Sequence, residues 1–269
     1  MKFFLLFFIT FNIFSQAQAS DSDFLSLCKV TLANNPNGPS LCDGIHKKFF
    51  LDNKKGDIVS VTPSQVGAPA MSLDNKIDFF VFNDPNFFSG FAYCYFVYRN
   101  WIAPTQMGPD QLAMSATGFS VLNEDVALYQ DWLKNKDAGK KCRARVEKES
   151  EVSVADLEKR LQGKVALIGL NPYASIQTPN VTEDAVLKDM MLTLNHERIH
   201  AYQVACPEFE KWSMAQWQGL AVKSKNEFIK RYPNYTWSIP KIAGREYIGF
   251  LYEGTPESAL AHIGNCKIK

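Results

Sequence analysis

The segment His196-Glu197-Arg198-Ile199-His200 constrains the fold of this chain more than any other feature. Residues four apart on an α-helix lie on one face, with their Cβ atoms about 5–6 Å apart, so a helix here would bring both imidazoles to one ion. The surrounding sequence predicts that helix. Thr182 is a suitable N-cap, two acidic residues follow it, and apolar residues then recur at helical spacing. We therefore expect one long helix that ends near Ala205.

The chemistry of this segment indicates a zinc site. Zinc accepts neutral imidazole nitrogens, which His196 and His200 would supply. Glu197 lies about 100° around the helix from His196, where it can take a proton from a water molecule on the ion. The alternative is a structural pair of hydrogen-bonded histidines, with Glu197 in a salt bridge. The chain has only 4 histidines, so a chance match to this spacing is rare and the metal site is favoured.

A catalytic zinc ion needs a third protein ligand and an open position. The downstream sequence Glu253-Gly254-Thr255-Pro256-Glu257 supplies two candidates. With the histidine segment, it resembles the gluzincin metallopeptidases, the group that contains thermolysin, aminopeptidase N-like enzymes and bacterial collagenases. In the aminopeptidase and collagenase branches the third ligand is the glutamate before a glycine. The resemblance therefore implies Zn²⁺ held by His196, His200 and Glu253, with Glu257 as the alternative third ligand.

The resemblance covers about residues 165–264 and implies a zincin-like catalytic region at residues 161–269. Such a region has an active-site helix beside an edge strand, for which residues 175–178 are the candidate. Residues 164–170 read as a buried strand, and Thr255-Pro256-Glu257 as a helix start. Candidate donors to an oxyanion are Tyr202, Tyr247 and Tyr252.

The N-terminus indicates export. Lys2 precedes an apolar run over residues 3–14, and Ala17-Gln18-Ala19 follows, which is typical of a cleavable signal peptide at residues 1–19. The run is shorter than the roughly 20 apolar residues that span a bilayer, so we expect no stable membrane insertion after cleavage. The mature protein is then secreted or periplasmic.

All 6 cysteines lie beyond the signal peptide, and an even number in an exported chain predicts disulfides. Cys28 and Cys42 flank a short turn-rich loop. Cys206 and Cys266 follow the metal helix and the last helix, which leaves Cys94 and Cys142 as the third pair.

Residues 20–160 form a mixed α+β region, either a separate domain or part of the same one. The aromatic residues 77–101 predict two strands joined by a turn. With 29 Lys+Arg against 28 Asp+Glu, the chain has no basic field for a nucleic acid.

The sequence thus predicts a disulfide-bonded α+β protein that acts as a secreted zinc-dependent peptidase, with Glu197 as general base and a peptide or protein as substrate. Two alternatives stay open. One is an exported disulfide-bonded binding or inhibitor protein with a structural histidine pair, in which residues 79–101 form the interaction surface. The other is a zinc hydrolase of non-peptide amide bonds.

Overall fold

A computed structural model describes residues 23–51, 58–101, 107–146, 158–178, 180–233 and 235–262. The predicted signal peptide at residues 1–19 and the predicted disulfide partner Cys266 lie outside these ranges. In the described part, no helix has the length and apolar character needed to cross a membrane.

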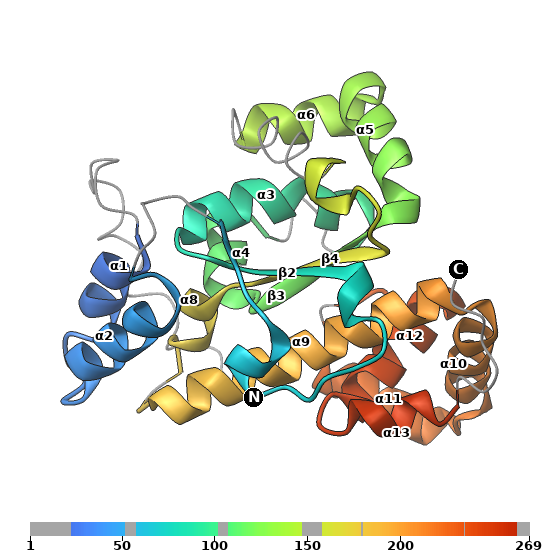
Figure 1. Cartoon of the computed structure of the whole chain (residues 1–269). Helices are drawn as coiled ribbons and strands as arrows, with labels where there is room; N and C mark the ends of the chain where they lie inside the picture. The colour runs from blue at the N-terminus through green and yellow to red at the C-terminus, as the bar shows by residue number, and fades with distance from the viewer. Residues whose placement is uncertain are drawn as a thin grey trace, which may run out of the picture.

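A sheet of four strands lies at the centre of the structure (Figure 1). Its strands, in the spatial order β1-β2-β4-β3, are β1 (Ile58–Ser60), β2 (Ile77–Phe82), β4 (Ala166–Leu170) and β3 (Gly118–Leu122). The central strands β2 and β4 are parallel, and each edge strand is antiparallel to its neighbour. The predicted buried strand over residues 164–170 is therefore confirmed, and strands from residues 20–160 share one sheet with it.

Helices cover both faces of this sheet and extend beyond one end of it, so the fold is mixed α and β as predicted. The helices are α1 (Phe24–Thr31), α2 (Gly38–Phe49), α3 (Pro85–Tyr98), α4 (Pro109–Ser115), α5 (Val126–Asn135), α6 (Asp137–Val146), α8 (Pro172–Ser175), α9 (Glu183–Ala205), α10 (Pro207–Gly219), α11 (Val222–Arg231), α12 (Pro240–Tyr252) and α13 (Pro256–Leu260).

The two faces of the sheet belong to two hydrophobic clusters, because successive side chains of a strand point to opposite sides. Phe79 and Val81 of β2 lie in the same cluster as Ile168 of β4, and this face is covered by α9. Phe80 and Phe82 of β2 lie in the other cluster, on the side of α3, α5 and α6. The long helix α9 is thus held against one face of the sheet.

The prediction of two aromatic strands over residues 77–101 is half wrong. Residues 77–82 form β2, but Pro85–Tyr98 form the helix α3. The Asp84 side chain caps this helix by accepting hydrogen bonds from Asn86 N at 2.8 Å and Phe87 N at 3.4 Å, and Pro85 occupies the first turn. Most of α3 is buried around its whole circumference, which hides the helical period in the sequence. Because most of residues 79–97 are buried, little of this part of the predicted interaction surface is exposed to a partner.

The prediction of an edge strand at residues 175–178 is also wrong. Pro172–Ser175 form the short helix α8, and a turn follows. Asn171 explains the change of direction after β4, because its side-chain amide donates to Ala113 O at 2.7 Å and to Ala116 O at 3.0 Å. The edge strand that lies beside α9 is β3.

Two disulfides agree with the predicted pairing. Cys28–Cys42 joins α1 to α2, and Cys94–Cys142 joins α3 to α6. Cys206, at the end of α9, is disulfide-bonded as well.

We expect the two described disulfides to differ in what they contribute to stability. Their cysteines are 48 and 14 residues apart, and the longer loop loses more chain entropy on closure. Replacing both Cys94 and Cys142 by Ala should lower the free energy of unfolding by about 4 kcal/mol, against about 3 kcal/mol for Cys28 and Cys42. Denaturant unfolding of the two double variants measures this, and a larger loss for the Cys28–Cys42 pair would contradict it.

Candidate metal centre

The helix α9 places His196 and His200 on one buried face. Thr182 caps it, as predicted, by accepting a hydrogen bond from Ala185 N at 3.2 Å. From Leu194 to Gln203 every residue is buried, because this part of the helix runs between the sheet and α12. The two imidazole rings lie edge to face, with their centroids 4.7 Å apart.

The third member of the site is Glu246, which comes from α12. This helix approaches α9 closely because it carries a glycine opposite the first histidine. A Cβ atom on Gly249 would lie 2.7 Å from His196 Cε1, so any larger residue there would push the imidazole out of place. Glu246 lies one turn earlier on α12 and is 3% exposed.

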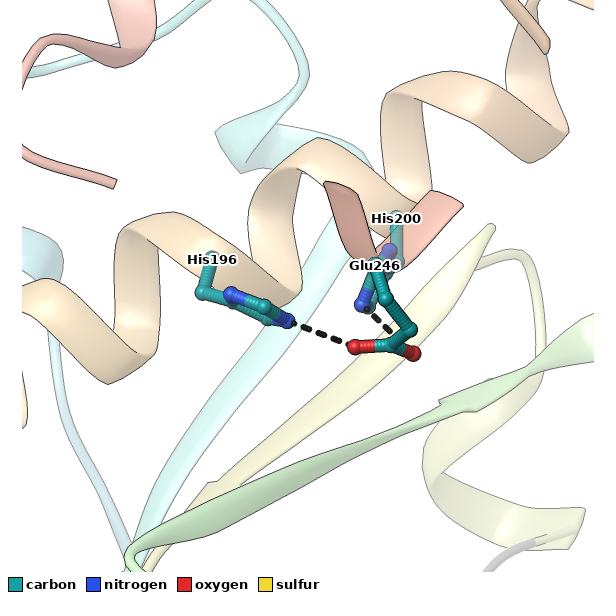
Figure 2. A group of neighbouring side chains, drawn as sticks. All are labelled: His196, His200 and Glu246. Atoms are coloured by element: carbon teal, nitrogen blue, oxygen red, sulfur yellow. Dashed lines mark hydrogen bonds and ion pairs between the residues drawn. The ribbon is translucent and has the colours of Figure 1, made fainter. Parts of the chain in front are cut away.

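Figure 2 shows the two imidazoles and the Glu246 carboxylate directed at one another. Glu246 Oε2 lies 3.2 Å from His196 Nε2, and Glu246 Oε1 lies 3.5 Å from His200 Nε2. Two ligand atoms about 2.0–2.1 Å from one tetrahedral zinc ion lie about 3.3–3.4 Å apart. The three side chains therefore fit one ion, with one ligand atom from each and all three atoms within 4.8 Å of one another.

The electrostatics of this group also suit a cation. Burial alone would lower the pKa of His196, but hydrogen bonds to Glu246 and Glu253 outweigh it and raise the pKa to about 10. Burial would raise the pKa of Glu246, but the positive charge of His200 and hydrogen bonds from both histidines lower it to about 2. A proton thus balances the buried carboxylate, and a metal ion would replace that proton.

Gln203 orients His200. Ser213 Oγ donates to Phe209 O at 2.8 Å, so it accepts the hydrogen bond from Gln203 Nε2 at 3.0 Å. The Gln203 amide oxygen then faces His200 Nδ1 at 3.0 Å and accepts a hydrogen bond from its N–H group. In the neutral form of His200 this chain of hydrogen bonds would keep the proton on Nδ1 and leave the lone pair of Nε2 for an ion. Gln203 was not among the residues predicted from the sequence, although it lies one helical turn after His200.

Glu253, the predicted third ligand, lies on the other side of His196. Its Oε2 is 3.6 Å from His196 Nδ1, whereas the ion would bind Nε2. Its side chain is 28% exposed, and its main-chain oxygen accepts a hydrogen bond from Asn195 Nδ2 at 2.9 Å. Glu257, the alternative, is exposed in the first turn of α13. The structure therefore brings Glu246 to the place that both Nε2 atoms face. It places Glu253 at Nδ1 of His196, where a residue that orients this histidine would lie.

Glu197, the predicted base, lies beside the histidines and lines the same cavity. It is 9% exposed, and its Oε2 has no hydrogen-bond partner among the described residues. A buried carboxylate oxygen without a partner is costly, so its presence beside the histidines marks Glu197 as a candidate functional residue.

The cavity has a volume of about 220 Å³. The side chains from α9 and α12 form its polar side, and the start of β3 forms another part of its wall. Tyr235 also lines it, whereas Tyr202, Tyr247 and Tyr252 do not. The Tyr202 hydroxyl instead forms hydrogen bonds with Ser72 Oγ and Leu73 N, each at 2.9 Å, and so holds the loop that precedes β2.

Comparison with known proteins found no match to the chain among protein-family models, curated proteins or solved structures. The site is therefore interpreted from its own geometry.

Three Glu→Gln variants distinguish a metal ligand from the other glutamates near the site. Glu246→Gln should weaken zinc binding most, because it removes a ligand and its negative charge. Glu253→Gln should lower the zinc affinity by about 10–100-fold, as expected of a residue that orients a ligand. Glu257→Gln is the matched control and should bind as the wild type does, since this residue is exposed.

Competition with a chromogenic chelator measures the three affinities. A larger loss for Glu253→Gln than for Glu246→Gln would contradict the assignment of Glu246, and would favour Glu253 as the third ligand.

Proposed function

We propose that the chain is an exported zinc-dependent peptidase, with His196, His200 and Glu246 as ligands. One observation carries this proposal: the three-residue group and Glu197 open on one cavity, beside the end of an edge strand. A group that held a metal only for stability would be closed by a fourth side chain and would need no carboxylate beside it.

The donor set supports zinc among the common metals. Two imidazole nitrogens and one carboxylate oxygen suit zinc, whereas calcium and magnesium prefer oxygen ligands alone. When bound, zinc would polarise the substrate carbonyl and lower the pKa of a coordinated water molecule.

Glu197 is the proposed general base. Its carboxylate, which lines the cavity, would accept a proton from the attacking water and then donate it to the leaving amine. The neighbouring Arg198 does not neutralise it, because the guanidinium of Arg198 binds Asp74 Oδ2 at 2.5 Å and Pro69 O at 2.8 Å.

Tyr235 is the proposed donor to the oxyanion that forms during attack. Burial first, and then the nearby carboxylates led by Glu246, raise the pKa of its hydroxyl well above the usual value. The hydroxyl therefore stays protonated at neutral pH and can donate a hydrogen bond to a negatively charged oxygen in the cavity.

The outer edge of β3 would bind the substrate main chain. Thr117 O accepts from Asn171 N and Asn123 N donates to Val165 O, so the odd-numbered residues of this strand face β4. The even-numbered residues then direct their main-chain groups outward. Leu122 N is occupied by Tyr95 Oη at 3.3 Å, which leaves the Gly118 end, at the cavity, for an extended peptide.

These features together support the resemblance to the gluzincin peptidases: a helix with the two histidines, an antiparallel edge strand beside it, and a glutamate ligand from a later helix. They modify it at one point, because Glu246 takes the place expected for Glu253. The disulfides and the predicted signal peptide support a secreted or periplasmic enzyme.

Glu197→Gln tests the proposed reaction. The variant should bind zinc as tightly as the wild type and lose about 10²–10⁴-fold in kcat, because the general base is gone while the ligands are intact. The assay measures zinc content by mass spectrometry and the hydrolysis of a mixed peptide pool. Hydrolysis should stop with a chelator and return with zinc.

Glu257→Gln again serves as the control, with wild-type hydrolysis expected. Full activity of zinc-loaded Glu197→Gln would rule out the proposed role of this residue.

A further inference from the structure

We propose that the cavity selects peptides with one large apolar side chain next to the cleaved bond. The wall that would bind this side chain consists of Phe96, Trp101, Met107 and Leu112, here called the apolar wall. This inference rests on the proposed peptidase function and names its substrate class.

The end of α3 places two aromatic rings of the apolar wall. Asn100 adopts a left-handed conformation with φ 57°, and Trp101 N donates back to Phe96 O at 2.9 Å. This helix ending turns the chain and lays the Trp101 ring edge to face on the Phe96 ring, with centroids 5.2 Å apart. The Arg99 guanidinium covers Trp101 at 5.5 Å, and Arg99 is itself paired with Asp125. The two rings are therefore held in place without a substrate.

The segment before β3 supplies the other half of the apolar wall. Met107 is half-buried, and its main-chain oxygen accepts a hydrogen bond from Tyr93 Oη at 3.0 Å. Leu112, on α4, is 2% exposed and lines the cavity. Met114, two residues later on the same helix, is 38% exposed and does not line it. The helix α4 thus presents only one face to the cavity.

The polar and the apolar side chains that line the cavity come largely from different parts of the fold. The histidines and carboxylates come from α9, α12 and the residue after α12, with Phe250 of α12 beside His196, and the apolar wall comes from α3, α4 and the residues that follow or precede them. The Gly118 end of β3 lies in the same lining. A peptide that pairs with β3 would place its scissile carbonyl near the polar side and a neighbouring side chain against the apolar wall.

Size and charge narrow the choice of side chain. The volume of about 220 Å³ is below the about 300–1,000 Å³ of pockets for drug-sized ligands, so it suits one large side chain. An acidic side chain would meet three carboxylates there, and no Lys or Arg is among the described residues that line the cavity. A basic side chain would lose its hydration against the apolar wall, because none of the four residues of that wall is acidic and could pair with it.

The test uses zinc-loaded full-length protein and quenched fluorescent peptides that differ at one position on either side of the scissile bond. The wild type should prefer Phe or Leu over Ala, Lys and Glu at one of these positions, by at least tenfold in kcat/KM. Met107→Lys should shift the ratio of Glu to Leu substrates by at least tenfold toward Glu, because the new charge replaces part of the apolar wall. Met114→Lys is the matched control, with an unchanged ratio.

A ratio of two substrates measured on one preparation does not depend on the fraction of folded protein. Cleavage by the wild type without a preference for large apolar residues, or an unchanged ratio in Met107→Lys, overturns this inference and leaves the peptidase function in place. No cleavage of any peptide by the zinc-loaded protein overturns the peptidase function itself.

Discussion

The contact of two buried imidazoles with one buried carboxylate is the constraint on which the rest of this structure depends. Three titratable groups out of water are costly unless each is paired, and the Glu246 carboxylate lies within 3.5 Å of both histidines. The contact requires α9 and α12 to lie close together at one point. Gly249 makes that approach possible, and Gln203 sets the orientation of His200. The packing of the two helices, which a larger residue at position 249 would disrupt, is therefore part of the site.

The position of α9 against the sheet is fixed by a second set of polar contacts. Arg198 is fully buried and binds the loop before β2 through Asp74 and Pro69. On the opposite side, Thr193 Oγ1 lies 2.8 Å from Thr117 Oγ1, at the start of β3. These contacts lock the rotation of the helix, so that the histidines face the end of the edge strand. A catalytic arrangement needs this precision, because a shift of about 1 Å can cost about 100-fold in rate.

The sequence predicted what local signals determine. The Thr182 cap, the long helix to Ala205 and the strand after Lys164 depend on neighbouring residues alone, and all three are present. The pairs Cys28–Cys42 and Cys94–Cys142 were also predicted, from loop length and elimination. Segments whose surroundings are set by tertiary packing were misjudged.

The helix α3 is apolar on all sides because it lies inside an aromatic cluster, so it resembled strands. Glu246 was not among the predicted ligands, because the sequence of residues 242–252 has no pattern that distinguishes a helix from a strand. Only the helical form, lying across α9, turns its carboxylate toward the histidines.

The direct test of this arrangement is anomalous diffraction at the zinc edge from crystals of the zinc-loaded protein. We expect one zinc ion bonded to His196 Nε2, His200 Nε2 and a Glu246 oxygen, at about 2.0–2.2 Å. An ion bound through Glu253 instead of Glu246, or no ion at these histidines, would contradict it.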